Sequence, residues 1–168
     1  HRPVRRARVP AVTMRASTST TGAATASPAP AHAPARRVED AFAALHDADT
    51  ALLVPGVVAA TTATLRALTN PGGHIIASDQ TADPLRGVLT QELAGLGRTV
   101  TFVDSTDADA VLTAVRPETQ VVYTQSLSDP LMRPAPPNQL AIHAQMHDLL
   151  LVVDNTPLSP AARPPLST

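Results

Sequence analysis

The sequence predicts an α/β fold in which helices flank a mostly parallel sheet. Short runs rich in β-branched residues alternate with segments of about ten residues whose apolar side chains recur at helical spacing. Such alternation is typical of right-handed βαβ units, which build parallel sheets. Acidic and hydroxyl residues follow the ends of the runs, where open α/β sheets bind their ligands. The clearest case is Leu149 to Val153, five apolar residues that end in Asp154-Asn155-Thr156.

The first 35 residues differ in composition from the rest. They contain no Asp or Glu, they carry five arginines, and Ala, Pro, Ser and Thr make up most of the remainder. Such a segment has too few large apolar groups to offset the entropy lost on ordering. We therefore expect residues 1–35 to be a disordered tail and residues 36–168 to be the folded part. An Arg-rich, acid-free segment is also typical of an organellar transit peptide, and this alternative stays open.

The overall composition excludes several classes of protein. Hydrophobic residues make up 43% of the chain, so a core can form, but aromatics are only 2%, so Ala, Val and Leu must fill it. A net charge of −1 argues against a nucleic-acid partner. The chain has no cysteine, hence no disulfide and no thiolate metal site. No apolar run approaches the roughly 20 residues that span a bilayer, so we expect a cytoplasmic protein without a membrane partner.

The first expected elements precede Asn70. Val38, Phe42 and Leu45 share one helical face, and acidic residues occupy the first turn, where the helix dipole favours them. A short apolar piece at 51–54 is broken by Pro55-Gly56. The Ala/Thr/Leu-rich segment 57–69 is expected to be a helix that Asn70-Pro71-Gly72-Gly73 stops.

The remaining elements alternate regularly. Strands are expected at 74–78, 99–103, 120–123 and 149–153, each a short run rich in β-branched or other apolar residues. Helices are expected at 84–96, where three leucines recur at i, i+4 and i+8, at 107–115, which Ser105, Thr106 or Asp107 caps, and at 138–148.

The polar residues at the strand ends favour a small-molecule or cofactor site over a purely structural domain. They are Asp79, Asp104, residues 125–129 and Asp154 with its two neighbours. The alternative is that each forms a turn or caps the next element, as Asp, Ser and Asn often do. His143 and His147 lie four residues apart on an expected helix, but the sequence offers no third ligand, so no metal site is predicted.

Five blocks of sequence, in order, resemble one known family. They are VEDAFAALHDADTALL, NPGGHIIASD (the family's KPGDHVVASD), TVTFVDSTD (its VTFVDTTD), QVVYTQSLSDPLM (its VYLETPSNPLL) and LLLVVDNTPLSPAARPPL (its LLVVDNTFATPxLQxPL). Residues 36–166 thus resemble the N-terminal part of the large domain of the Cys/Met-metabolism pyridoxal-phosphate (PLP) enzymes, the cystathionine γ-synthase and γ-lyase relatives. The resemblance implies a truncated fold type I domain, PLP as cofactor, an amino-acid substrate, and a homo-oligomer for the full-length protein.

The resemblance also implies roles for individual residues. Asp154 matches the acid that pairs with the pyridine nitrogen of the cofactor, and Thr156 lies beside it in the motif. Gly56 and Val57 match the Gly-Met pair whose backbone N–H groups hold the cofactor phosphate, which agrees with anion binding at helix N-termini. Asp129 stands where the family's Ser-Asn-Pro asparagine would contact the phenolic oxygen.

Departures from the family pattern bear on activity. All thirteen basic residues are arginines, so the lysine to which the family attaches its cofactor is absent from these 168 residues. The family's stacking tyrosine falls on Ala82, and Pro55 removes a hydroxyl and an N–H from the phosphate loop. We therefore expect a fragment or diverged member of the transsulfuration family that is not catalytic alone. The alternative is a structural or partner-binding domain that retains only the fold.

Overall fold

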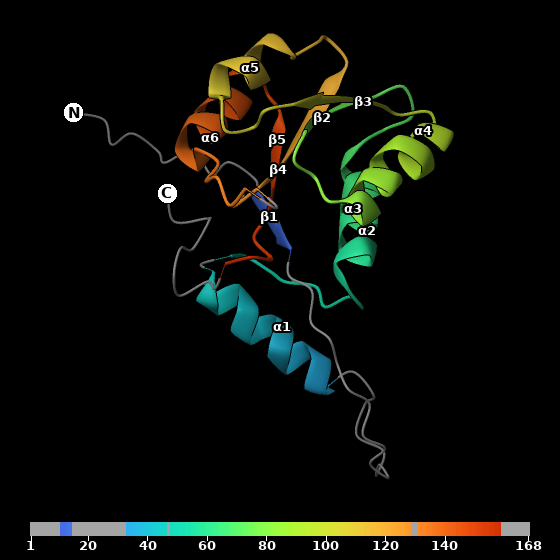
Figure 1. The fold of residues 1–168 in the computed structure, drawn as a ribbon. Coiled ribbons are helices and arrows are strands. Elements are labelled where there is room, and N and C mark those ends of the chain that lie inside the picture. The colour runs from blue at the N-terminus through green and yellow to red at the C-terminus, as the bar shows by residue number, and fades with distance from the viewer. Residues whose placement is uncertain (1–10, 15–32, 47, 129–130, 159–168) are drawn as a thin grey trace, which may run out of the picture.

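Five parallel strands form one sheet in the order β1-β5-β4-β2-β3 (Figure 1). The computed structural model describes residues 11–14, 33–46, 48–128 and 131–158. The strands are β1 Ala11–Met14, β2 His74–Ser78, β3 Thr99–Val103, β4 Thr119–Gln125 and β5 Leu150–Asp154. The helices are α1 Ala33–Leu45, α2 Val57–Leu68, α3 Asp83–Gly87, α4 Leu93–Gly95, α5 Ala108–Thr113 and α6 Pro137–Met146, and a π-helical stretch, Val88–Glu92, joins α3 to α4. This architecture confirms the predicted α/β class.

Helices cover both faces of the sheet, and each face has its own apolar core (Figure 1). The α2 and α3–α4 helices pack on one face against Ile75, Val121, Tyr123 and Val152. The α5 and α6 helices pack on the other face, where the core includes Ile76, Val122, Leu140, Leu151 and Val153. Successive side chains of a strand point to opposite faces, so a central strand needs apolar residues at every position. This requirement explains why the strands appear in the sequence as continuous apolar runs.

The expected elements after residue 56 match the observed ones closely. The strands predicted at 74–78 and 99–103 have the predicted bounds, and the helix predicted at 84–96 forms with a π-helical turn in its middle. Residues 51–54, the short apolar piece before Pro55, have no regular structure. None of the helices in the described part of the chain combines the length and apolarity that crossing a membrane requires.

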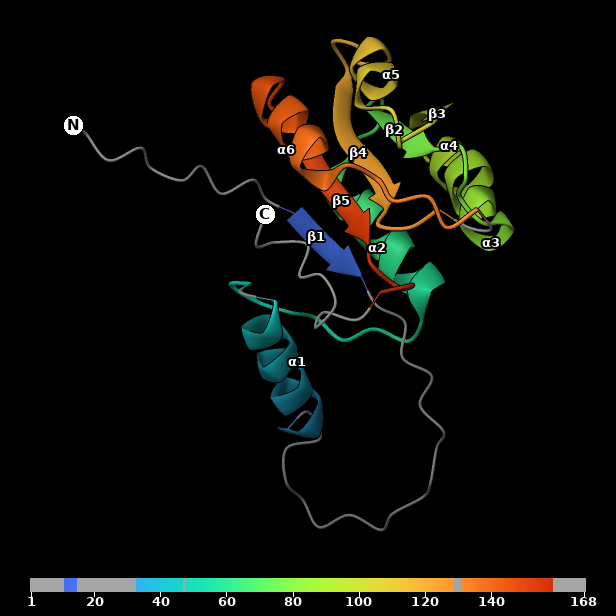
Figure 2. The same ribbon diagram turned by 60° about the vertical axis from the view of Figure 1, so that its left-hand side comes forward.

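The edge strand β1 corrects the prediction for the N-terminal tail. Ala11–Met14 lies within the segment expected to be disordered, yet it pairs in parallel with Leu151–Asp154 of β5. Backbone hydrogen bonding to an open sheet edge provides order that composition does not reveal. Residues 1–10 and 15–32 lie outside the described residues. The first helix begins at Ala33, three residues before the predicted start, and lies apart from the sheet in both views (Figures 1 and 2).

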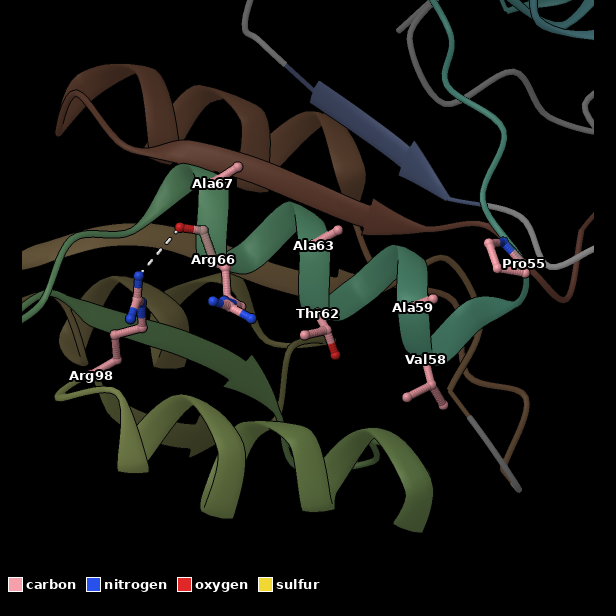
Figure 3. Close-up of a pocket in the computed structure, with 8 residues that line it drawn as sticks. All are labelled: Pro55, Val58, Ala59, Thr62, Ala63, Arg66, Ala67 and Arg98. Carbon is pink, nitrogen blue, oxygen red and sulfur yellow. Dashed lines mark hydrogen bonds between the residues drawn. The ribbon is translucent and has the colours of Figure 1, made fainter. Parts of the chain in front are cut away.

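Arg98 ties the end of α2 to the start of β3. Its guanidinium donates to Thr69 Oγ1 (2.8 Å) and to the carbonyl oxygens of Thr69 (2.7 Å), Leu96 (3.1 Å) and Arg66 (3.3 Å). Figure 3 shows the bond to Arg66. The last carbonyls of a helix have no intrahelical partner and carry partial negative charge. Arg98 is 9% exposed, so it serves as a buried C-terminal cap for α2.

The turn before β2 requires glycine at position 73. A Cβ atom there would lie 2.5 Å from Gln120 Oε1 and 2.9 Å from the Asn70 carbonyl oxygen. Gln120 cannot move away without losing the hydrogen bond that its Oε1 accepts from the Asn70 N–H at 2.8 Å. The sequence NPGG therefore stops α2 and also joins the start of β2 to β4.

A buried histidine lies at the amino end of the sheet, opposite the edge where ligands are expected. His74 is fully buried, and its ring nitrogens lie 2.8 Å from Thr119 Oγ1 and 2.8 Å from Thr101 Oγ1. Burial lowers the pKa of His74, the nearby Arg116 cation lowers it further, and Glu118 partly opposes both effects. The imidazole is therefore held in its neutral form.

This histidine predicts a loss of stability in mild acid. The pKa of His74 is about 6.5 when the chain is unfolded and lower when it is folded. The unfolded state thus binds the proton first, so the free energy of unfolding should fall as the pH drops below about 6.5. Urea titrations from pH 7.5 to 5 should show this fall in the wild type and a smaller one in His74→Gln, which cannot titrate. Equal pH slopes for the two proteins would contradict the assignment.

Candidate cofactor site

Asp154 lies at the carboxyl end of β5 and is 1% exposed. Its Oδ1 accepts hydrogen bonds from the Thr156 N–H at 2.9 Å and from the Thr156 hydroxyl. Its Oδ2 lies 3.3 Å from the Tyr123 hydroxyl, which donates to it. Within the described ranges no cationic side chain forms an ion pair with this carboxylate. A buried carboxylate held only by neutral donors keeps its negative charge available to a cationic ligand.

Tyr123 and Gln125 lie beside Asp154 because of the strand register. Gln125 pairs with Asp154 and Tyr123 pairs with Val152, so the side chains of Tyr123, Gln125 and Asp154 share one face of the sheet. Burial raises the pKa of the Tyr123 phenol strongly, and the charge of Asp154 raises it further, whereas the buried Thr61 hydroxyl on α2 acts in the opposite direction. The phenol is therefore a permanent donor at neutral pH.

Two buried amide oxygens beside Asp154 lack donors. Gln125 is 7% exposed and Asn155 is 3% exposed, and neither Gln125 Oε1 nor Asn155 Oδ1 accepts a hydrogen bond from the described part of the chain. Buried polar atoms are almost always hydrogen-bonded, so an unpartnered pair needs an explanation. A ligand with N–H or O–H groups at this edge of the sheet would supply the missing donors.

The loop before α2 reaches the same edge of the sheet. Gly56 has φ = 100°, a conformation that favours glycine, and it precedes the first turn of α2, which has no side-chain cap. A Cβ at Gly56 would meet no atom within 4 Å, so the space around it is open. Figure 2 shows the first turn of α2 on the side to which the arrows of β4 and β5 point. The start of α2 therefore lies on the side of the sheet where Asp154 ends β5.

Asp129, the remaining predicted site residue, lies outside the described residues together with Pro130. The loop on either side is ordered by hydrogen bonds from the Arg133 N–H to Ser128 Oγ (3.0 Å) and from the Met132 N–H to the Ser128 carbonyl (2.7 Å). Ser128 itself is buried. The structure thus brings Asp154 and Thr156 together at the end of β5, with the start of α2 on the same side of the sheet, and the position of Asp129 stays a prediction.

One hollow in the surface of the described residues lies away from these site residues. It follows the outer face of α2 and is lined by small residues together with Pro55, Val58, Arg66 and Arg98 (Figure 3). A second hollow is lined by side chains around the ion pair between Arg133 and Asp104. In this pair Arg133 Nη1 lies 3.1 Å from Asp104 Oδ2. None of the predicted cofactor residues lines either one. In the described ranges there is also no group of three or more acidic or histidine side chains that could hold a metal ion.

Gln125 and Asn155 belong to the strand-end residues from which the sequence predicts a site, whereas Tyr123 was missed. The signal that could have revealed Tyr123 is its spacing from Gln125, because residues two apart on a strand share a face. Their meeting with Asp154 also required the register between β4 and β5, which neither strand encodes alone.

Comparisons with known proteins point to one family. The sequence profile described as Cys/Met metabolism PLP-dependent enzyme matches residues 31–168. The chain is 30% identical over 132 residues to the L-methionine gamma-lyase of Treponema denticola, covering 77% of this chain and 33% of that protein. It is 33% identical over 100 residues to the cystathionine gamma-lyase of Bacillus subtilis, covering 60% of this chain and 26% of that protein.

A solved structure shares the fold. The cystathionine gamma-lyase from Lactobacillus plantarum, complexed with L-serine, superposes with a TM-score of 0.70 at 31% identity, over 73% of this chain and 32% of that one. The chain therefore spans about a third of the length of the proteins it matches.

Proposed function

Because this chain belongs to the family of Cys/Met metabolism PLP-dependent enzymes, we propose that it binds PLP non-covalently at the carboxyl ends of β4 and β5. In this proposal residues 36–168 are part of the large domain of an enzyme that carries out elimination or replacement on sulfur amino acids. Cystathionine, homoserine esters and methionine are the substrate class. These 168 residues alone do not turn such substrates over.

The observation that carries the proposal is the environment of Asp154. A buried carboxylate with neutral hydrogen-bond donors on both oxygens, and with no cationic partner among the described residues, is matched to a protonated ring nitrogen. The amide oxygens of Gln125 and Asn155, which have no donor among the described residues, support the same conclusion, since a buried acceptor without a hydrogen bond is costly.

Each predicted residue has a place in this proposal. Asp154 would pair with the ring nitrogen, and Thr156 would keep Asp154 in position through its two hydrogen bonds. Gly56 and Val57 would present backbone N–H groups to the phosphate. Asp129 would lie near the phenolic oxygen, where its negative charge would weaken rather than strengthen binding. When bound, PLP supplies an electron sink for a carbanion formed on an amino acid.

A second candidate function rests on what the chain lacks. With no lysine in the sequence, Ala82 in place of a stacking ring and Pro55 in the phosphate loop, a pseudoenzyme domain that binds a partner or only packs is the alternative. Measuring PLP binding distinguishes the two candidate functions, because a domain that retains only the fold is not expected to bind PLP. We further propose that the full-length protein is a cytoplasmic homo-oligomer.

Replacing Asp154 should weaken PLP binding more than any other carboxylate change. Loss of a charge-assisted hydrogen bond costs about 1.5–3 kcal/mol, so Asp154→Ala should raise the Kd at least about tenfold. Asp129→Ala should leave the affinity equal or improve it, because it removes a negative charge. The measurement is equilibrium titration of the full chain with PLP, monitored by its visible absorbance.

The control is Asp104→Ala, at the end of β3, whose carboxylate bonds to Thr106 and Arg133 rather than to the site. Far-UV circular dichroism checks that each variant is folded. Equal losses in Asp154→Ala and Asp104→Ala, or a larger loss in Asp129→Ala, would remove Asp154 from the site.

A further inference from the structure

We propose that Tyr123 is a positioning residue for Asp154, fixing its carboxylate for contact with a cationic ring nitrogen. The inference rests on the proposed function and adds to it a residue that neither the motif nor the resemblance assigned. Tyr123 would not touch the reacting atoms and would act only through Asp154.

The geometry makes Tyr123 the one described side chain that holds Oδ2. Thr156 supplies both hydrogen bonds to Oδ1, and it follows Asp154 in the chain, so that contact is local. The Tyr123 hydroxyl comes from the neighbouring strand and lies 3.3 Å from Oδ2. Without it, rotation about the bond to the carboxyl group would be restrained at one oxygen only.

Burial gives this contact its strength and its constancy. Tyr123 is 0% exposed and Asp154 is 1% exposed, so water does not compete for either group, and hydrogen bonds are stronger in such surroundings. The raised pKa of Tyr123 keeps the hydroxyl protonated, so it remains a donor through neutral and moderately alkaline pH. A neutral donor also leaves the charge of Asp154 uncompensated, whereas an arginine in its place would neutralise it.

The composition of the chain makes the contact directly measurable. Tyr123 is the single tyrosine and the chain has no tryptophan, so tyrosinate absorbance near 295 nm reports this side chain alone. An exposed tyrosine, with a pKa of about 10, is about nine-tenths ionised at pH 11. In the full wild-type chain we expect no tyrosinate over the pH range in which circular dichroism shows the native fold.

Substituting the partner should shift this titration. Asp154→Asn removes the negative charge that opposes ionisation of the phenol, so tyrosinate should form at lower pH than in the wild type. This arm needs no cofactor. A wild-type chain that titrates near pH 10 while still folded would overturn the inference, as would identical curves for the wild type and Asp154→Asn.

The second arm measures PLP binding to Tyr123→Phe, which removes only the hydroxyl. We expect the Kd for PLP to rise about three- to tenfold, the value of one hydrogen bond. The matched control is Thr124→Val, which removes a buried hydroxyl from the next residue on the opposite face, where it bonds to Ser105 Oγ at 2.9 Å. Its affinity should equal that of the wild type.

The two arms separate the two hypotheses. Wild-type binding with an unchanged Kd in Tyr123→Phe would overturn the positioning role and leave the proposed function standing. If the wild type binds no PLP, the proposed function and the positioning role both fail, while the alkaline titration still measures the pairing of Tyr123 with Asp154.

Discussion

Incubation of these 168 residues with PLP followed by borohydride reduction should leave no labelled side chain. Enzymes of this family attach PLP to a lysine amine, and the chain contains none. Arginine cannot replace lysine, because its guanidinium stays protonated and is a poor nucleophile. The α-amino group of the first residue is the only primary amine in this polypeptide. Peptide mapping by mass spectrometry should therefore find label at that position or nowhere.

The same reasoning predicts no turnover by this polypeptide alone. Release of a keto acid from cystathionine or methionine should not exceed that of free PLP at the same concentration, which is the necessary control. A second control is the urea-unfolded chain, in which any labelling of the first residue should persist. A stoichiometric adduct at another residue, or steady release of keto acid above that of free PLP, would contradict the prediction.

Arg98→Ala should lower the free energy of unfolding by about 2 to 4 kcal/mol. The substitution removes four hydrogen bonds and takes the donor from the buried carbonyl oxygen of Thr69 at the end of α2. It also removes the positive charge that offsets the C-terminal end of the helix dipole. Urea unfolding monitored by circular dichroism measures the loss.

Arg66→Ala is the matched control, because Arg66 is an exposed arginine on the last turn of α2 and its hydrogen bond with Arg98 uses its backbone oxygen, which the substitution keeps. Its effect should stay within about 0.5 kcal/mol. Arg98→Lys should recover little of the lost free energy of unfolding, since an ammonium group cannot reproduce the planar set of hydrogen-bond donors of the guanidinium. An Arg98→Ala protein as stable as Arg66→Ala would show that the cap contributes nothing.

Under the proposed function, the end of the site that would meet the ring nitrogen keeps its chemistry, because the hydrogen bonds between Asp154 and Thr156 form locally. The positions that the resemblance matches to the stacking ring and the phosphate loop, Ala82 and Pro55, depart from the family pattern. We therefore expect the affinity for PLP to depend on Asp154 more than on any other residue of this chain.

The amino-acid sequence by itself determined the fold class, the strands β2 to β5 and the helices between them. Strands buried on both faces need continuous apolar runs, and the helices between them need apolar residues on one side only, so both leave local patterns. The Asp154–Thr156 contact is also local, since a side chain that bonds two residues ahead needs no other part of the fold.

Only the tertiary structure decided the features that depend on pairing between distant segments. The tail strand Ala11–Met14 gains its order from the open edge of β5, and residues 51–54 remain irregular although they are apolar. Tyr123 reaches Asp154, 31 residues away, through the register of β4 and β5, and Arg98 reaches Thr69, 29 residues away, across the end of α2. Local sequence patterns cannot specify such contacts, because strand order and register are set by the packing of all elements together.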